Sequence, residues 1–297
     1  MGFVTNRWQP VNASPGPTPV PTWERIKNGV TATTAFDYSS YNYTEYLILV
    51  YSSSSYFQFF FLPSFQSLRN GNATQYVAIS HTAPRITFNI RQKTTNKTSS
   101  YKYTVYGRNK ASWSLVSDTS ALPNYTELVT GNGYYTPFKY QDSDMRTAGG
   151  SLWISSTNVT YSDYRERIYN NAYTLSTGDG RVWTRLSSNE ASWTHINSTT
   201  SPVSIADISY SEMFIIGKSL FSTGALNREY QALYVFPDML KGNFPAGGYT
   251  SYSSSSNYTG SWGDLTVSDS SVSAEYFSKN GTGAITRLFQ SIDIYYR

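Results

Sequence analysis

Side chains able to perform acid–base or nucleophilic chemistry are few in this sequence of 297 residues. It contains two histidines, His81 and His195, and no cysteine. A catalytic triad or a metal site requires a histidine close to an acid or to several further ligands, and neither histidine has such a neighbour along the chain. We expect His81 to lie in a turn just before Pro84, and His195 to be a surface or interface residue.

Carboxylates are scattered rather than clustered. A glycosidase requires two of them about 5–9.5 Å apart across a groove, and spacing along the chain does not predict such a pair. The short glycine motifs at 131–133 and 281–283 lack the Lys-Ser/Thr that a phosphate-binding loop carries. We therefore predict no enzyme activity, no cofactor and no metal site. The acidic residues considered are Asp142, Asp144, Asp179, Asp207, Asp238, Asp264 and Glu275.

The segment 247–264 mixes Tyr and Trp with Ser, Gly and Asn. Binding loops use this composition because aromatic rings supply contact area at low entropy cost and the small polar residues adapt their hydrogen bonds. Two interpretations stay open, a long solvated loop with buried rings and a receptor-binding surface. The candidate binding residues are Tyr252, Tyr258 and Trp262, with a second group at Tyr134, Tyr135 and Trp153.

The composition predicts an all-β protein. Aromatic residues make up 16% of the chain and charged residues 14%, which suits strands and turns better than long helices. The net charge of +4 is not gathered into a basic stripe, so we expect no nucleic-acid partner. No apolar stretch approaches the ~18 residues of a membrane span, and the N-terminus lacks the apolar core of a signal peptide.

An internal repeat divides the chain. Four blocks occur twice in the same order, and each unit closes with an alternating strand that ends in Arg. The paired blocks are 23–26 with 193–196, 43–50 with 210–217, 56–63 with 230–237, and 103–108 with 292–297. We predict two copies of one β-sandwich-like module, at 23–110 and 193–297, with a small β domain at 111–192 between them. Prolines recur in residues 1–22, which predicts an extended anchor segment without sheet pairing.

Residues 180–196 resemble the end of the knob domain of pyocin and bacteriophage fibres. That family closes with an R-x-Y/W-x-R strand, a polar turn and S/T-W-x-x-W/I; the matching residues are Arg181, Trp183, Arg185, Ser192 and Trp193. The segments 122–128 and 131–135 resemble the opening of the family. Ile196 departs from the aromatic residue that usually ends the motif. We expect Trp193 to pack at the junction between this knob-like domain and the second module.

This resemblance implies a homotrimeric virion protein made in the host cytoplasm, where a chain without disulfides folds readily. The expected function is a bacteriophage tail fibre or receptor-binding appendage that attaches to a glycan or protein of the host surface. Residues 1–22 would join it to other virion proteins. A head fibre or capsid decoration protein is the alternative within the same class, and a polysaccharide depolymerase is the alternative from another class.

Overall fold

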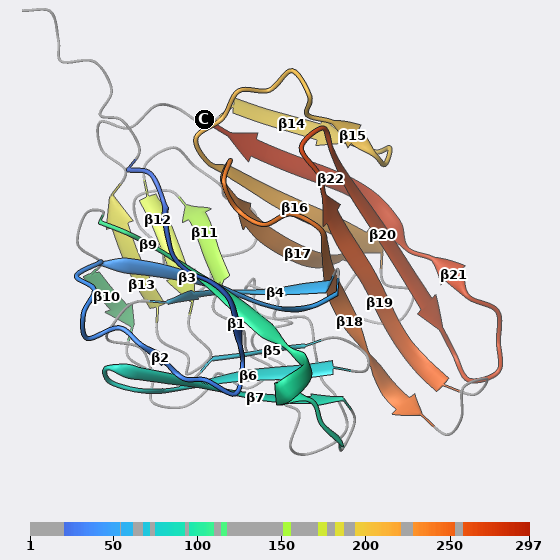
Figure 1. Ribbon diagram of the computed structural model, residues 1–297. Helices are drawn as coiled ribbons and strands as arrows, with labels where there is room; N and C mark the ends of the chain where they lie inside the picture. Colours follow the sequence, from blue (N-terminus) through green and yellow to red (C-terminus); the bar gives the residue numbers. More distant parts are fainter. Residues whose placement is uncertain are drawn as a thin grey trace, which may run out of the picture.

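The computed structural model contains strands and one short 3₁₀ turn, η1 (Thr98–Ser100), and the residues that it describes include no α-helix (Figure 1). The all-β prediction is confirmed. The described residues are 21–53, 55–61, 68–71, 75–92, 95–109, 114–117, 151–155, 172–176, 182–186, 194–220, 228–252 and 258–297.

The first half of the molecule, residues 23–109, forms two packed layers. One layer has the strand order β1-β9-β3-β4 and the other the order β2-β7-β6-β5, with β8 beside β7. The strands of the first layer are β1 (Glu24–Thr31), β9 (Lys102–Arg108), β3 (Glu45–Ser52) and β4 (Ser55–Phe61). Those of the second are β2 (Phe36–Asp37), β7 (Arg85–Gln92), β6 (Gln75–Thr82), β5 (Leu68–Gly71) and β8 (Thr95–Asn96).

The second half, residues 194–297, repeats this strand order position by position. One layer runs β14-β22-β16-β17 and the other β15-β20-β19-β18, with β21 beside β20. The strands are β14 (Thr194–Ser198), β22 (Phe289–Tyr296), β16 (Met213–Leu220), β17 (Arg228–Val235), β15 (Val203–Ser204), β20 (Ser271–Lys279), β19 (Tyr258–Val267), β18 (Asn243–Tyr252) and β21 (Thr286–Arg287). The division of the chain into modules stays a prediction.

The core between the two layers of the first half is formed by apolar residues that alternate with polar ones along the strands. Ile86, Phe88 and Ile90 on β7 are buried, as their alternation predicts. The ring of Phe88 stacks on Tyr103 of β9 at a centroid distance of 4.5 Å. The short segment between β3 and β4 makes a tight hairpin, because Ser52 pairs directly with Ser55. The sequence predicts this turn correctly.

Two strands of the first half are buried on both faces. Every residue of β3 from Glu45 to Val50 is buried, and so is every residue of β9 from Tyr103 to Arg108. Alternation in β9 predicts a polar outer face, yet Thr104 and Tyr106 are as inaccessible as Val105. The second half covers Tyr106, because Phe236 meets its ring at 5.0 Å and the N–H of Leu240 donates to its hydroxyl. The hydroxyl of Thr104 is enclosed within the first half, where it accepts from the N–H of Gly29 and donates to Asn28.

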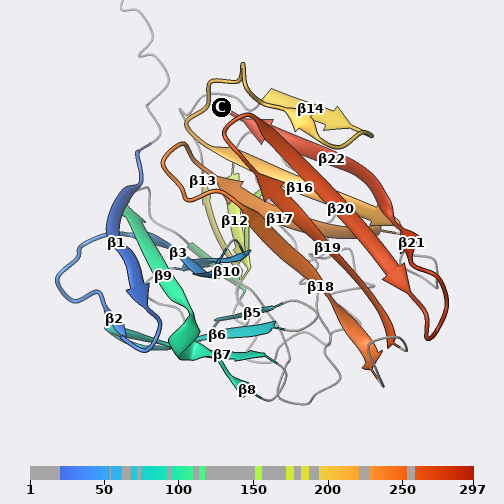
Figure 2. The same ribbon diagram turned by 45° about the vertical axis from the view of Figure 1, so that its right-hand side comes forward.

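The two halves also share one sheet. β18 lies beside β4 through a parallel pair, Asn243 with Ser55. The strand path β1-β9-β3-β4-β18-β19-β20-β15 therefore runs without a break through both halves (Figures 1 and 2). The two halves of the chain thus form one connected structure.

A four-stranded sheet from the middle of the chain has the order β10-β13-β12-β11. Its strands are β10 (Ser114–Ser117), β13 (Val182–Leu186), β12 (Ala172–Ser176) and β11 (Ser151–Ser155). The sequence predicts strands at 151–155, 172–175 and 181–186 of this domain, and the structure confirms a strand at each of the three places. The sequence also predicts a strand at 164–169, which lies outside the described residues, as do residues 1–20 of the anchor predicted at 1–22. β11 contacts both β4 and β17, so this sheet touches both halves.

Two local predictions are wrong. Both interpretations of the segment 247–264 assume a loop, but most of the segment belongs to β18 and β19, which pair from Asn243–Thr266 to Tyr252–Tyr258. Pairing with the long strand β20 extends this hairpin and satisfies its backbone. His81 lies within β6 rather than in a turn, and its Nε2 is 2.6 Å from the hydroxyl of Tyr38.

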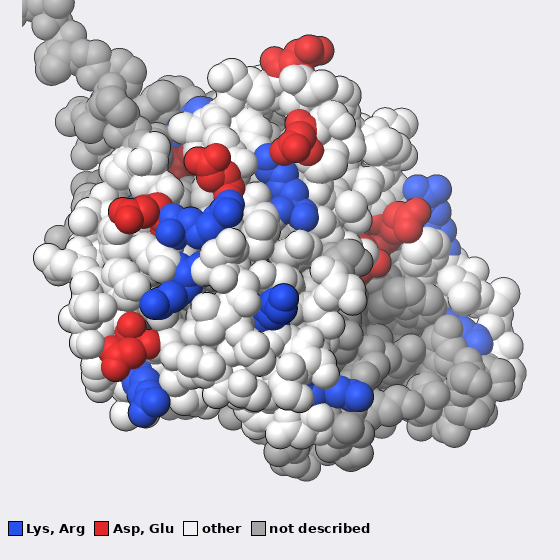
Figure 3. Space-filling model, in the orientation of Figure 1, with Lys and Arg blue, Asp and Glu red and all other residues white. Residues whose placement is uncertain are grey.

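The surface shows no large region of one charge sign on the face drawn in Figure 3, where acidic and basic side chains alternate. Within the described part of the chain, no helix has the length and hydropathy needed to cross a bilayer.

Candidate functional site

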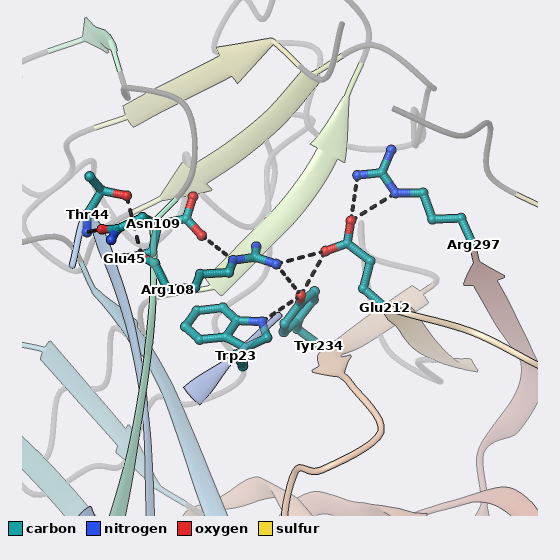
Figure 4. A network of polar contacts seen from close by, with 8 residues as sticks. All are labelled: Trp23, Thr44, Glu45, Arg108, Asn109, Glu212, Tyr234 and Arg297. Atoms are coloured by element: carbon teal, nitrogen blue, oxygen red, sulfur yellow. Dashed lines mark hydrogen bonds and ion pairs between the residues drawn. The ribbon is translucent and has the colours of Figure 1, made fainter. Parts of the chain in front are cut away.

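A buried network of ion pairs lies where the two halves meet (Figure 4). Nε of Arg108, at the end of β9, donates to Glu45 at 2.7 Å, and its Nη1 donates to Glu212 at 3.2 Å. Nε of Arg297 donates to the other oxygen of Glu212 at 2.8 Å. All four side chains have 0% exposure. Two positive and two negative groups are therefore enclosed together with no net charge.

Tyr234 completes the network from β17. Its hydroxyl donates to Oε2 of Glu212 at 2.7 Å and accepts from Nη1 of Arg108 at 2.9 Å. It also accepts from Nε1 of Trp23 at 2.8 Å. One donor and two acceptor sites exhaust the capacity of a tyrosine hydroxyl, so every one of its hydrogen bonds is formed.

Burial and charge decide the protonation of these groups. Burial raises the pKa of Tyr234 well above its ordinary value, Arg108 opposes the shift and Glu212 adds to it, so the hydroxyl keeps its proton. Burial alone would lower the pKa of Arg108, but the surrounding negative groups, led by Glu45, raise it instead. The guanidinium also lies 4.3 Å from the centre of the Trp23 ring, a cation–π distance.

Further contacts across the joint involve the backbone of residues 234–240. The amide of Gln58 donates to the carbonyl of Tyr234 at 2.6 Å and accepts from its N–H at 3.1 Å. The N–H of Leu240 donates to the hydroxyl of Tyr106 at 3.0 Å. Phe236 stacks on Trp23 at 5.4 Å and meets Tyr106 edge-on at 5.0 Å. Apolar and polar contacts thus hold the same surface together.

This network is a joint between the halves and not an open site, because its charged groups are closed to solvent. Glu45 and Glu212 occupy equivalent positions of the repeat, as do Arg108 and Arg297. Sequence reasoning treated these residues as marks of the repeat and missed the ion pairs. The available signal was the recurrence of one Glu and one Arg per unit in a chain with only 14% charged residues.

The predicted binding residues Tyr252, Tyr258 and Trp262 fall on the β18–β19 hairpin. Tyr252 pairs with Tyr258 at the end of the hairpin, and Trp262 pairs with Gly247 farther along. Leu265 on the same strand β19 is fully buried in the core. Because successive residues of a strand alternate between faces, positions 258 and 262 belong to the face opposite Leu265. The strand register therefore brings the three predicted positions to one ribbon.

Two carboxylates lie side by side near this ribbon. Asp264 on β19 pairs in register with Glu275 on β20. Burial raises the pKa of Asp264, a hydrogen bond from Asn243 opposes the shift, and the charge of Glu275 adds to it. Like charges directly opposite one another destabilise a sheet. The charged form of Asp264 therefore lowers the stability of the folded protein.

We expect Asp264→Asn to stabilise the protein at neutral pH. A raised carboxyl pKa means that the charged form is disfavoured in the folded state. Removing the charge should therefore increase the free energy of unfolding at pH values above that pKa. The gain should fade as the pH falls toward 3.8, the ordinary value, because the wild-type carboxyl is then neutral too. Partial exposure screens the effect, so thermal melts should show a rise of about 1–3 °C at pH 7. Glu275→Gln is the control and should gain less; equal melting of Asp264→Asn and wild type would contradict this.

Among the remaining predicted residues, the structure describes only Trp153. Trp153 lies on β11, in the middle sheet. Tyr134, Tyr135 and the predicted junction residue Trp193 lie outside the described residues. The repeat counterpart of Trp193 is Trp23, which does pack at the joint between the halves. The position equivalent to Trp193 in the repeat was a signal that could have predicted the burial of Trp23 at the joint.

His195 is half exposed, and its Nε2 is 2.9 Å from Asp293, whose side chain is 3% exposed. Its ring stacks on Tyr295 at 4.2 Å. In the ranges that the structure describes, no three His, Asp or Glu side chains gather as a metal site would require.

Comparison of the chain with protein-family models, with curated proteins and with solved structures gave no match in any of the three. The resemblance to the fibre knob domain therefore stays a prediction.

Proposed function

We propose that this protein is a bacteriophage virion fibre that attaches the particle to the host cell surface, and that it acts by binding rather than by catalysis. The observation that carries the proposal is the placement of the aromatic hairpin. The free end of the β18–β19 hairpin lies on the side of the molecule away from the start of β1, the first described strand (Figures 1 and 2). An N-terminal anchor and a contact surface would thus occupy opposite ends.

The joint between the halves supports a mechanical role. A fibre must transmit the position of its tip to the particle, which requires that its parts do not swing independently. The shared sheet and the buried network of Arg108, Glu45 and Glu212 meet this requirement. We include in the proposal the homotrimer expected from the resemblance, with residues 1–22 joining the fibre to other virion proteins.

Replacing Tyr252, Tyr258 and Trp262 together by alanine is expected to weaken attachment to host cells by about 10- to 100-fold. Interface hot spots are enriched in Trp and Tyr because these rings bury much area at low entropy cost. Binding of labelled protein to host cells measures the effect, and thermal melting checks that the fold persists. An unchanged binding curve with an intact fold would move the search to Tyr134, Tyr135 and Trp153.

The triple variant also requires a control on the same molecule. Ile285 is an exposed apolar residue, 55% accessible, between β20 and β21. Ile285→Ala removes apolar surface outside the β18–β19 hairpin and should leave binding unchanged. A loss of binding in this control equal to that of the triple variant would reject the hairpin as the contact surface.

Incubation with host-surface polysaccharide tests the enzymatic alternative. If the protein were a depolymerase, the paired carboxylates Asp264 and Glu275 would be its candidate catalytic residues. A glycosidase needs one carboxyl group with a raised pKa, and the pKa of Asp264 is raised. Bound polysaccharide that stays uncut supports attachment. Cleavage that disappears in Asp264→Asn would support a depolymerase instead.

Binding of residues 1–22 to purified capsids and not to tails would favour a head fibre.

A further inference from the structure

β14 is an outer strand of the sheet β14-β22-β16-β17 and carries no Lys, Arg, Asp or Glu. All five of its residues pair with β22 in unbroken register. Both views place it on the outside of the molecule (Figures 1 and 2). Among the described residues, no backbone–backbone hydrogen bond joins β14 to any strand except β22. One edge of β14 therefore presents backbone donors and acceptors outward.

The equivalent strand of the first half, β1, is protected in ways that β14 is not. Its pairing with β9 shifts register twice, between Arg25 and Lys27 and between Lys27 and Val30. Gly29 within it has a φ of +64°, a left-handed conformation that interrupts a regular edge. Bulges and charged side chains are the usual means of preventing edge pairing. The two halves, which share one strand order, thus have one blocked edge and one open edge at the same position.

We propose that two copies of this chain pair through β14, antiparallel and about a two-fold axis at Ile196, so that their sheets become continuous. The five residues of β14 are complementary to themselves in this register. Thr194 of one copy lies opposite Ser198 of the other, His195 lies opposite Asn197, and Ile196 meets its own counterpart. No pair places like charges opposite one another, and the β-branched residues suit a strand.

The outer face of β14 is ordered before any pairing. Asp293 on β22 accepts a hydrogen bond from Asn197 at 2.6 Å and lies 2.9 Å from Nε2 of His195. Side chains that are already fixed lose less entropy on association. The inference does not depend on the proposed attachment function, because it concerns the edge of a different sheet from the one that holds the β18–β19 hairpin.

Two double variants test the pairing. Thr194→Lys with Ser198→Lys places two lysines opposite each other at both ends of the paired segment. Thr194→Glu with Ser198→Lys instead places opposite charges there, with a similar burden on the fold. We expect the dilysine variant to raise the dissociation constant about tenfold or more, and the charge-paired variant to assemble like the wild type.

Sedimentation equilibrium of the full chain measures the assembly. Pairing predicts a wild-type mass of two chains, or of six if the chains also trimerise. A mass of one or three chains, or a dilysine variant that assembles as the wild type does, overturns the proposal.

Hydrogen exchange of the wild type gives a second reading that needs no variant. The backbone amides of residues 194–198 should exchange more slowly as the protein concentration rises through the dissociation constant. Exchange that is independent of concentration overturns the pairing. Host-cell attachment is a separate readout, so failure of the pairing and failure of the attachment function are distinguishable.

Discussion

Replacing Arg108 by alanine is expected to lower the free energy of unfolding by about 3–5 kcal/mol, which a urea titration would measure. Arg108 binds Glu45 of its own half and Glu212 of the other, and all three side chains are inaccessible to solvent. Its removal takes the guanidinium at 2.7 Å from Glu45, while Glu212 keeps Arg297 and the hydroxyl of Tyr234. The loss of a positive charge beside two buried carboxylates is the reason for so large a loss.

Two comparisons make this prediction specific. Adding Glu45→Gln to Arg108→Ala should recover part of the stability, because one carboxylate is then removed together with the guanidinium and Glu212 keeps its ion pair with Arg297. Lys241→Ala breaks a surface ion pair with Asp269, which is 91% exposed, and should cost far less stability than Arg108→Ala because solvent screens the pair. Equal losses for Arg108→Ala and Lys241→Ala would show that the network does not hold the halves together.

Trp23→Ala is expected to cost about 3–5 kcal/mol, although Trp23 precedes the first strand. Its ring is 7% exposed and stacks on Phe236 of the second half. The same ring lies under the guanidinium of Arg108, and its N–H donates to Tyr234. The substitution therefore opens a cavity and also removes one hydrogen bond from a buried network. Unfolding monitored by circular dichroism gives the free energy.

Trp23→Phe separates packing from hydrogen bonding. Phenylalanine keeps an aromatic ring against Phe236 but cannot donate to the hydroxyl of Tyr234, so we expect a loss of about 1–2 kcal/mol. If both variants unfold at the wild-type urea concentration, Trp23 does not contribute to the joint. A cost of Trp23→Phe as large as that of Trp23→Ala would assign the whole effect to the hydrogen bond.

Local pattern was enough to predict several elements. The alternation of Ile86, Phe88 and Ile90 predicts the buried face of β7, and the serine run after Tyr51 predicts the turn into β4. Both features depend on residues close in sequence. The hairpin of β18 and β19 was mistaken for a loop, because its Gly and Ser residues resemble loop composition. Its strand character comes from pairing with β20, which composition does not reveal.

The ion pairs, too, depend on tertiary contacts that local sequence pattern does not reveal. Glu45 and Arg108 are 63 residues apart, and Arg108 and Glu212 are 104 apart, so no local spacing predicts their contact. Residue type alone suggested Tyr252, Tyr258 and Trp262 as binding residues. Only the strand register shows that Tyr252 lies opposite Tyr258 on one hairpin.

The sequence by itself determined that this chain is built of strands, because alternating apolar and aromatic residues suit a pleated surface and no stretch has helical periodicity. It also contained the repeated Glu and Arg of each unit. Only the tertiary structure decided that the outer face of β3 and β9 is buried and that β4 and β18 join in one sheet. The physical reason is that side-chain burial and charge pairing depend on which surfaces meet, and the two halves meet through residues far apart in the chain.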